Sequence, residues 1–418
     1  MNQKTDILVI GGGAIGVCSA YYLSEQGRNV MIVEKGEICS GSSYGNAGMI
    51  VPSHSIPLAA PGVVSKGIRW LFNPESPFYI KPRFSLEFFS WLWKFHRACN
   101  RHHMHRSIPV IRDLNLASLQ LFEKLATIDG LDFGFEKKGM LSIFNSKKGL
   151  DEGLEEARLM QASGLEARIL SAQEIQELIP HSRVTAAGGV FYPQDACIIP
   201  QPFVTETARF IEKKGVQIQT FTEVLGFEIT DGRITTVKTT RGDITAKEVV
   251  LAGGVWSPEI VRDLKIKLPI QPAKGYSITY HRPHRCPELP IAMAEAKVIL
   301  TPMGDTMRFA GTLELAGFDL SINMRRVQAI INNVPKYLPE MHHDSLNLIE
   351  IWRGLRPCTP DGLPFIGRSP RYKNLIIAAG HAMIGISLSP ITGKLVSQLA
   401  AHENTLIDLT PLRIDRFG

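Results

Sequence analysis

The chain has 418 residues, of which 44% are hydrophobic and 21% charged, and its formal net charge is +6. That length predicts roughly two domains, and the composition is typical of a soluble globular protein. The charge suits anionic ligands or an anionic membrane surface, and no Lys/Arg run is longer than two, which argues against nucleic acid. Glycines interrupt the apolar start, which argues against a signal peptide, and no apolar run reaches the roughly 18 residues of a membrane-spanning helix. The six scattered cysteines include no Cys-x-x-Cys pair, so they predict reduced thiols in a cytoplasmic protein and no metal site.

Residues 5–34 predict a strand, a helix and a second strand. The apolar run at 7–10 is typical of a buried parallel strand, residues 14–26 have helical spacing, and residues 29–33 are again apolar. Gly27 stands where the helix needs a left-handed cap. This pattern indicates a β-α-β unit.

Three glycines with the spacing Gly-x-Gly-x-x-Gly join the first strand to the helix. Gly11 permits the turn, Gly13 lets the backbone approach a pyrophosphate, and Gly16 lets helix and strand pack closely. The helix N-terminus offers N–H groups to phosphates. Glu34, at the end of the second strand, is placed to accept hydrogen bonds from a ribose. The unit therefore predicts a dinucleotide site.

Residues 39–48 read CSGSSYGNAG. Such small residues let the backbone lie close to a flat ligand, although a flexible surface loop has the same composition.

Aromatic residues are concentrated between Trp70 and Arg97, and Lys and Arg are interleaved with them. This combination can rest on a membrane interface or stack on nucleic-acid bases. The alternative is that the aromatic side chains form the core of a second domain. His102, His103 and His105 follow without acidic neighbours, so we expect no metal site there.

The middle of the chain alternates between helices and strands. Residues 108–125 and 147–163 look helical, residues 133–144 look like strands around a turn at 137–139, and residues 188–199 look like a link back to the first domain. After a helix at 202–214 and a strand at 216–221, we expect a meander at 224–229, 233–240 and 244–246. A further strand is expected at 248–251, and it ends in small residues. Ligands bind at such carboxyl ends of strands in open α/β sheets. Long strands at 270–280 and 297–315 and a helix at 324–337 complete this part.

The C-terminal segment holds two arginines among apolar and proline residues. Arg353 and Arg356 lie in WRGLRPCTPDGLPFIG, and a guanidinium held there suits a carboxylate through two parallel bonds. The alternative is a structural ion pair with Asp361 or Glu350. A strand at 375–379 leads to His381 and to a helix expected at 385–402, whose N-terminus can stabilise developing negative charge.

Together, GGGAIG with Glu34, SSYGNAG, VVLAGGVWS, GLRPCTPDGLPFIG and GHAMIGISLSPITGKLV resemble the D-amino-acid oxidase-like family of FAD flavoproteins. The resemblance covers nearly the whole chain and is closest to the bacterial D-amino-acid dehydrogenase and glycine oxidase branches. It implies an α/β (α+β) two-domain fold, with a Rossmann-like FAD-binding domain at 1–50, 200–265 and 350–418. A discontinuous β-rich substrate domain would take 51–199 and 266–349.

The resemblance also implies roles for single residues. Arg356 would hold the substrate carboxylate, and His381 would lie close to the flavin as a second catalytic candidate. Non-covalent FAD would be bound by residues from all the motifs: Gly11, Gly13, Ala14, Ile15, Gly16, Glu34, Lys35, Ser42, Ser43, Asn46, Ala47, Gly48, Val224, Gly253, Gly380, Met383, Gly385, Ile386 and Ser387.

Three positions depart from related branches. Met383 replaces a second arginine of the glycine oxidase branch, and Ile299 replaces its tyrosine, so the pocket is more apolar than one for glycine. Cys358 does not match the cysteine that carries flavin in sarcosine oxidases, so the FAD should be non-covalent.

The implied reaction is oxidative deamination of a D-amino acid or a cyclic imino acid, by hydride transfer from the α-carbon to flavin N5. Electrons would pass to a quinone-type acceptor or to O₂. The alternatives are a glycine, sarcosine or hydroxyproline specialist, or, in another class, a flavin-containing tRNA-modifying protein. We expect a cytoplasmic protein with no nucleic-acid partner and with peripheral contact to the inner face of the membrane.

Overall fold

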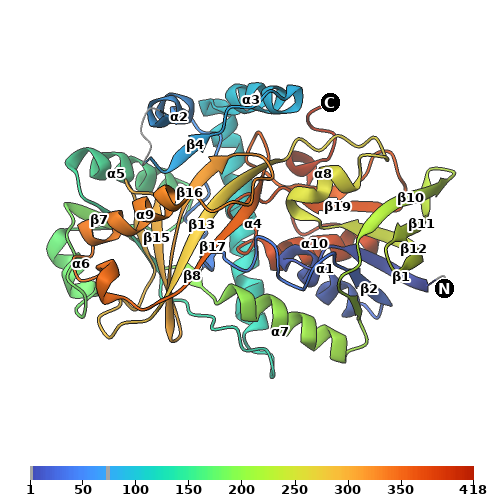
Figure 1. Cartoon of the computed structure of the whole chain (residues 1–418), viewed down its shortest axis with the longest axis horizontal. Coiled ribbons are helices and arrows are strands. Elements are labelled where there is room, and N and C mark those ends of the chain that lie inside the picture. Colours follow the sequence, from blue (N-terminus) through green and yellow to red (C-terminus); the bar gives the residue numbers. More distant parts are fainter. Residues whose placement is uncertain (1–2, 72–75) are drawn as a thin grey trace.

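Two large β-sheets lie side by side in the computed structural model, which describes residues 3–71 and 76–418 (Figure 1). The eight-stranded sheet has the order β10-β11-β12-β1-β2-β9, with β19 beside β12 and β18 beside β19. Its strands are β1 (Gln3–Ile10), β2 (Val30–Val33), β9 (Gln217–Gln219), β10 (Val224–Thr230), β11 (Arg233–Thr239), β12 (Gly242–Leu251), β18 (Phe365–Arg368) and β19 (Leu375–Ala379).

The first strand is buried on both faces, as the apolar run predicts. Ile7 and Val9 belong to the core on one side of the sheet, while Leu8 and Ile10 belong to the core on the other. β1 pairs in parallel with both β2 and β12, so it is central. A central parallel strand has no polar face, which explains the uninterrupted apolar run at residues 7–10 of β1.

Helices cover one face of this sheet. α1 (Ala14–Ser24) packs against α10 (Ser389–Ala400) and α7 (Pro200–Lys213). α4 (Arg101–Leu125) packs against α10, and its Ile108 also packs with residues of the second sheet and of the helix at 147–162, so α4 contacts both sheets' layers. On the opposite face lie α8 (Ser257–Ile260) and the segment that follows it.

The nine-stranded sheet has the order β17-β13-β16-β15-β14-β5-β7-β6, with β4 beside β16. α6 (Ala172–Leu178) and α9 (Met324–Asn333) pack on one face, α5 (Lys147–Ala162) packs beside β5 and β7, and part of the other face turns toward the first sheet. The strands are β4 (Phe78–Ile80), β5 (Met140–Phe144), β6 (Arg168–Leu170), β7 (Gly188–Tyr192), β13 (Gln271–His281), β14 (Ile291–Met293), β15 (Val298–Met303), β16 (Thr306–Leu315) and β17 (Leu348–Cys358).

Several predicted elements are wrong in their bounds. Residues 188–192 are strand β7 inside the nine-stranded sheet and not a link, because they pair with both β5 and β6. Residues 244–251 belong to one strand, β12, since residues 242–244 pair with β11 and residues 244–251 pair without a break in the strand with β1. Residues 133–138 make only an isolated bridge, from Glu136 to Cys197. The C-terminal helix begins at Ser389 and not at 385.

The expected domain boundary at residue 350 falls inside β17. That strand pairs antiparallel with β13 from Leu348 to Cys358, so it is part of the nine-stranded sheet. A short two-stranded ladder joins β3 (Met49–Ile50) to β8 (Ala196–Cys197).

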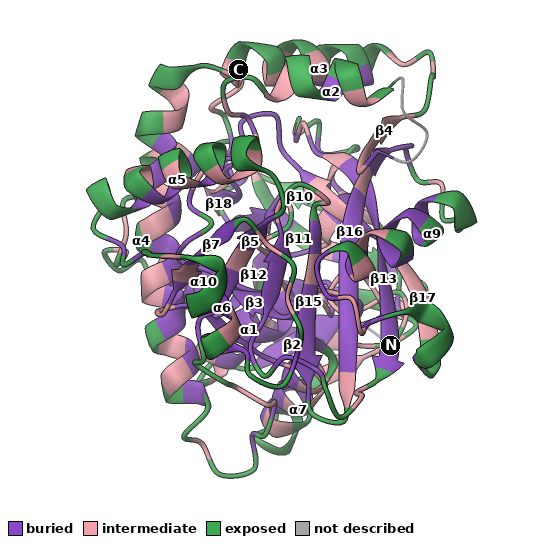
Figure 2. Ribbon diagram, turned by 90° about the vertical axis from the view of Figure 1, so that its left-hand side faces the viewer, coloured by how far each residue is buried: buried purple, intermediate pink, exposed green. Residues whose placement is uncertain are grey.

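The segment rich in aromatics forms α2 (Val63–Leu71), β4 and α3 (Leu86–Ala98). Figure 2 shows that the strands of the sheets are mostly buried, whereas α2 and α3 are largely exposed. Phe88 and Trp91 are buried, but Phe84, Phe89 and Trp93 are exposed, so the expectation of a domain core fails for these three. Phe72 lies outside the described residues. Among the described residues, no helix is both long and apolar enough to cross a membrane.

Candidate active site

A large cavity runs between the two sheets and is lined by residues of both. Its volume is about 1740 Å³, compared with roughly 300–1,000 Å³ for a typical small-ligand pocket. Glu34 and Val224 line it on the side of the first sheet, and Arg356 and Ile299 line it on the side of the second. The cavity therefore has room for a dinucleotide together with a small substrate.

The glycine turn has the geometry that the spacing predicts. Gly11 adopts φ +116°, and a Cβ on Gly16 would lie 1.9 Å from the carbonyl oxygen of Gly11. A Cβ on Gly13, by contrast, would meet only the Ser43 hydroxyl, at 3.4 Å. Gly13 is the N-cap of α1 and lines the cavity, so a phosphate can approach the backbone there.

Glu34 holds the same turn together. Its carboxylate accepts hydrogen bonds from the N–H of Gly12 at 2.7 Å and of Gly36 at 2.9 Å. Each oxygen can accept a further hydrogen bond, and Glu34 lines the cavity, so a ribose can still be bound. Lys35 also lines the cavity, and its ammonium lies 4.5 Å from the ring centroid of Trp256.

The loop of small residues crosses the cavity wall. The Ser42 hydroxyl donates to the carbonyl of Leu355, and the N–H of Ala14 donates to Ser43 Oγ at 3.1 Å. Asn46 Oδ1 accepts from the N–H of Gly48, whose φ is +72°. The loop thus ties the glycine turn to β17.

Sequence reasoning missed the residue that fixes this loop. Arg308, on β16, donates to the carbonyl oxygens of Tyr44 at 3.0 Å and Asn46 at 2.8 Å. It is more than 250 residues away in the chain, and no local pattern marks it.

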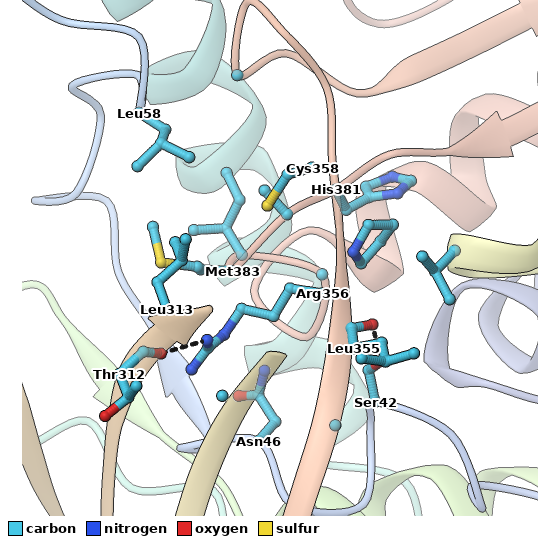
Figure 3. Close-up of a pocket in the computed structure, with 18 of the residues that line it drawn as sticks. Ser42, Asn46, Leu58, Thr312, Leu313, Leu355, Arg356, Cys358, His381 and Met383 are labelled. Atoms are coloured by element: carbon cyan, nitrogen blue, oxygen red, sulfur yellow. Dashed lines mark hydrogen bonds between the residues drawn. The ribbon is translucent and has the colours of Figure 1, made fainter. Parts of the chain in front are cut away.

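Arg356 lies half-buried on β17 and points into the cavity (Figure 3). Its Nη1 donates to the carbonyl of Thr312 at 2.7 Å. Among the described residues no carboxylate pairs with it, and Asp361 pairs instead with Arg416, at 2.7 Å. A Cβ on Gly275 would lie 2.1 Å from Nη1, so a glycine is needed beside the guanidinium. Burial lowers the pKa of Arg356, and an external anion would offset that cost.

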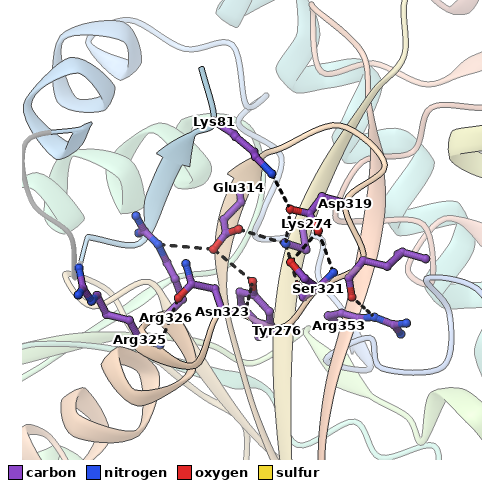
Figure 4. A network of polar contacts seen from close by, with 11 residues as sticks. Lys81, Lys274, Tyr276, Glu314, Asp319, Ser321, Asn323, Arg325, Arg326 and Arg353 are labelled. Carbon is purple, nitrogen blue, oxygen red and sulfur yellow. Dashed lines mark hydrogen bonds and ion pairs between the residues drawn. The ribbon is translucent and has the colours of Figure 1, made fainter. Parts of the chain in front are cut away.

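Arg353 has a different task. Its Nε donates to the carbonyl of Leu320 at 2.8 Å, in the loop 316–323 that follows β16. Lys274 donates to Ser321 of the same loop and pairs with the buried Glu314, as Figure 4 shows. The loop contributes Leu320 to the cavity wall, so Arg353 supports the wall.

His381 is buried, and its Nε2 lies 3.0 Å from the hydroxyl of Thr392 on α10. In Figure 3 the ring is directed away from Arg356. Burial lowers the pKa of His381 to about 3, so the imidazole is neutral at physiological pH. Its catalytic role stays a prediction.

Most of the proposed FAD-binding residues line the cavity, but Gly16, Gly48, Gly380 and Ser387 lie behind its wall. A Cβ on Gly380 would lie 2.6 Å from a Thr359 methyl group. The Ser387 hydroxyl donates to Asn115 at 2.6 Å and accepts from the N–H of Val51. These residues shape the wall, and Met383, Gly385 and Ile386 present its surface.

Apolar side chains surround Arg356. Figure 3 draws Leu313 and Met383 beside Arg356, with Leu58 farther off beyond them. Ile299 and Ala310 line the same cavity. Because Arg356 can bind a substrate carboxylate, the apolar wall beside it suits a substrate with an apolar side chain.

The glycine turn, the cavity between two domains and the isolated arginine define an oxidoreductase that uses a dinucleotide cofactor. The model of the DAO family, described as FAD dependent oxidoreductase, matches residues 6–399, and the chain belongs to this family. FAD fits the site, since Gly13 leaves open the approach to the helix N-terminus.

The chain is similar to curated and solved relatives over almost its full length. A D-amino acid dehydrogenase of Vibrio atlanticus (strain LGP32) is 32% identical over 99% of this chain and 100% of the relative. One of Granulibacter bethesdensis (strain ATCC BAA-1260 / CGDNIH1) is 30% identical over 99% of both chains. The crystal structure of glycine oxidase from Geobacillus kaustophilus superposes with a TM-score of 0.82 at 23% identity, covering 100% of both chains. L-proline dehydrogenase from P. horikoshii superposes with a TM-score of 0.80 at 21% identity, covering 100% of this chain and 98% of the other. The two solved structures indicate the fold alone.

Proposed function

We propose that the protein oxidises a D-amino acid with an apolar side chain, or a cyclic imino acid, to the imino acid. The observation that carries this proposal is Arg356, a guanidinium without a carboxylate partner among the described residues, in a cavity shared with the dinucleotide turn. The relatives named D-amino acid dehydrogenase support the same reading.

Bound FAD supplies the acceptor for the two electrons that leave the α-carbon as hydride. Arg356 holds the substrate carboxylate through two parallel charge-assisted bonds, which set both distance and angle. The Thr312 carbonyl keeps the guanidinium in one orientation. The apolar wall receives the side chain and excludes water.

The glycine alternative fits the cavity less well. Met383 and Ile299 stand at two positions where the glycine oxidase branch has polar side chains, and both line the cavity. A substrate with an apolar side chain can pack against these two residues, whereas glycine has no side chain to do so.

We further propose that electrons leave to a membrane quinone. Six apolar side chains are exposed on and beside α2 and α3, and we call this surface the α2/α3 face: Ile68, Leu71, Phe84, Leu86, Phe89 and Trp93. Arg69 and Arg97 are exposed on the same helices, which matches an anionic lipid surface. Trp91, Leu92 and Phe95 of α3 also line the cavity, so an apolar acceptor has a path from the bilayer.

Anaerobic mixing of the purified holoprotein with D- and L-amino acids tests the proposed reaction. We expect the flavin to bleach with apolar D-amino acids or cyclic imino acids. If no amino or imino acid reduces it, the proposed function is wrong.

A further inference from the structure

The segment after β3 carries a histidine to the cavity. His54 lines the same cavity as Arg356, and its exposed surface faces that cavity. Its Nδ1 lies 3.1 Å from the hydroxyl of Ser53. No residue in the described part of the chain hydrogen-bonds its Nε2. One ring nitrogen is therefore tied to the protein, and the other is left for a ligand.

Behind Ser53 lies a carboxyl group with no cation beside it. Asp195, in the turn between β7 and β8, is fully buried. It accepts hydrogen bonds from the N–H of Ser53, at 3.1 Å, and from the Ser53 hydroxyl. Among the described residues it forms no ion pair. Burial raises the pKa of Asp195 to about 7, although both bonds from Ser53 lower it, so this carboxyl can exchange a proton near neutral pH.

The single hydroxyl proton of Ser53 decides the tautomer of His54. Because the hydroxyl donates to Asp195, its oxygen is free to accept from Nδ1–H of His54. The lone pair of this tautomer is then on Nε2, the nitrogen that has no protein partner. A base oriented by a carboxylate behind it is a recurring arrangement for proton acceptance.

We propose that His54 accepts the proton of the substrate's ammonium group and that Ser53 and Asp195 carry that proton out of the cavity. The inference rests on the proposed function, since the amine must lose a proton before its lone pair can assist departure of the α-hydride.

The relay balances without a change of redox state. An N–H bond of the ammonium group breaks and a bond forms between the proton and His54 Nε2. The Nδ1 proton moves to Ser53 Oγ, and the hydroxyl proton of Ser53 moves to Asp195. The products are a neutral amine, a neutral imidazole and a neutral carboxylic acid. The two electrons leave afterwards with the α-hydrogen, which FAD accepts.

The charged and titratable groups near His54 explain why the proton does not stay on the imidazole but moves toward Asp195. Enclosure within the cavity, which reduces contact with bulk water, and the nearby charge of Lys297 lower the pKa of His54 to about 4. Glu156 and Tyr192 line the same cavity, and Asp195 lies behind Ser53. A lasting imidazolium is disfavoured, and Asp195, whose pKa is the higher of the two, is the group of the relay that holds the proton more readily.

Stopped-flow reduction of the holoenzyme, under anaerobic conditions and across a range of pH, tests this relay. We expect His54→Gln to slow flavin reduction about 100-fold at neutral pH. The loss should shrink as the pH rises, because the substrate then arrives with a neutral amine. Ser53→Ala and Asp195→Asn should each slow reduction about tenfold with the same pH dependence. Ser55→Ala removes a buried hydroxyl of the same segment, which bonds only to the carbonyl of Pro52, and should leave the profile unchanged.

A second readout does not depend on rate. The infrared difference spectrum of the substrate-reduced holoenzyme should show a newly protonated carboxyl group, and Asp195→Asn should remove that band. The inference is overturned if the pH profiles of His54→Gln and Asp195→Asn parallel that of the wild type, or if Asp195→Asn changes only the melting temperature. Either result would leave the proposed function intact as long as the wild-type flavin is reduced, whereas a wild type that no substrate reduces would overturn the proposed function itself.

Discussion

Nη1 of Arg356 donates to the carbonyl oxygen of Thr312 at 2.7 Å, and Thr312 holds that carbonyl in place with a left-handed backbone, φ +65°. A non-glycine residue in this region is strained and persists only where its surroundings impose it. The pairing of β13 with β16 shifts register between Lys274 and Tyr276, beside this residue. A carbonyl orients the guanidinium without neutralising it, so the positive charge stays available to a substrate carboxylate.

The first prediction concerns that charge. Arg356→Leu should lower kcat/KM by an amount equivalent to about 3 to 5 kcal/mol of activation free energy. This is the usual effect of removing one partner of a buried charged pair. Arg356→Lys keeps the charge but loses the planar fork, and it should be less damaging. Steady-state kinetics and flavin absorbance measure both effects, and FAD content should stay normal.

Arg353→Leu is the matched control for Arg356. It removes a neighbouring guanidinium that bonds only to the carbonyl of Leu320, so KM should change far less. A variant with leucine at 356 that kept wild-type kinetics would show that another residue holds the carboxylate.

The second prediction concerns the cofactor. Gly13 has φ −80°, and an added Cβ meets only Ser43 Oγ. Gly13→Val should therefore fold but fill the space for the pyrophosphate, and the purified protein should contain little FAD. Gly367→Ala, where the structure leaves open space within 4 Å, should bind FAD normally.

Denaturation of the wild type should release intact FAD into the supernatant, because the binding is non-covalent. Flavin that stays with the precipitated chain would contradict this expectation.

The β-α-β unit could be predicted because its determinants are local. Apolar runs, helical spacing and the glycine turn all lie within residues 5–34, and the structure places Gly11 and Gly16 as the spacing requires. Arg356 could be named from the family motif, but its partner could not. Thr312 is 44 residues away in the chain and meets Arg356 only because β13 pairs with both β16 and β17.

Long-range pairing explains the failures as well. Arg308 reaches the loop at Tyr44 and Asn46 only across the contact between the two domains. Residues 188–192 contain two glycines and precede a proline, so they look like a link, yet pairing on both sides makes them a strand. The relay of His54 with Asp195 likewise joins residues more than 140 positions apart, which no local pattern could show.

The third prediction concerns the α2/α3 face. We expect the wild type to sediment with anionic liposomes at low ionic strength and to be released by salt, because each well-placed Lys or Arg contributes about 1 kcal/mol. Phe89→Glu with Trp93→Glu should abolish sedimentation and leave reduction of the flavin by substrate unchanged.

Leu225→Glu is the control for these two changes, since Leu225 is exposed on β10, away from α2 and α3 (Figure 1). Binding that survives the double substitution of Phe89 and Trp93, or that all three glutamate substitutions weaken equally, would exclude a specific membrane contact through the α2/α3 face.

The last prediction concerns the buried charges behind the cavity wall. Glu314 is almost fully buried, lies 3.5 Å from both Lys274 and Arg326, and accepts a hydrogen bond from the Tyr276 hydroxyl at 3.2 Å (Figure 4). Glu314→Gln keeps the shape but leaves the buried Arg326 without a carboxylate and Lys274 with only Asp319, at 3.9 Å. We expect the free energy of unfolding to fall by about 3 to 5 kcal/mol, as for other buried pairs that lose one partner.

The exposed pair of Lys66 and Glu152 is the matched control, since its atoms are closer, at 2.7 Å, but lie in solvent. Glu152→Gln should cost less than about 1 kcal/mol, because water screens an exposed pair. Urea unfolding of the two variants measures the contrast. Because Lys274 also donates to Ser321 in loop 316–323, Glu314→Gln should in addition speed amide exchange in that loop. Equal losses of stability in the two variants would mean that Glu314 is not needed to neutralise the buried cations.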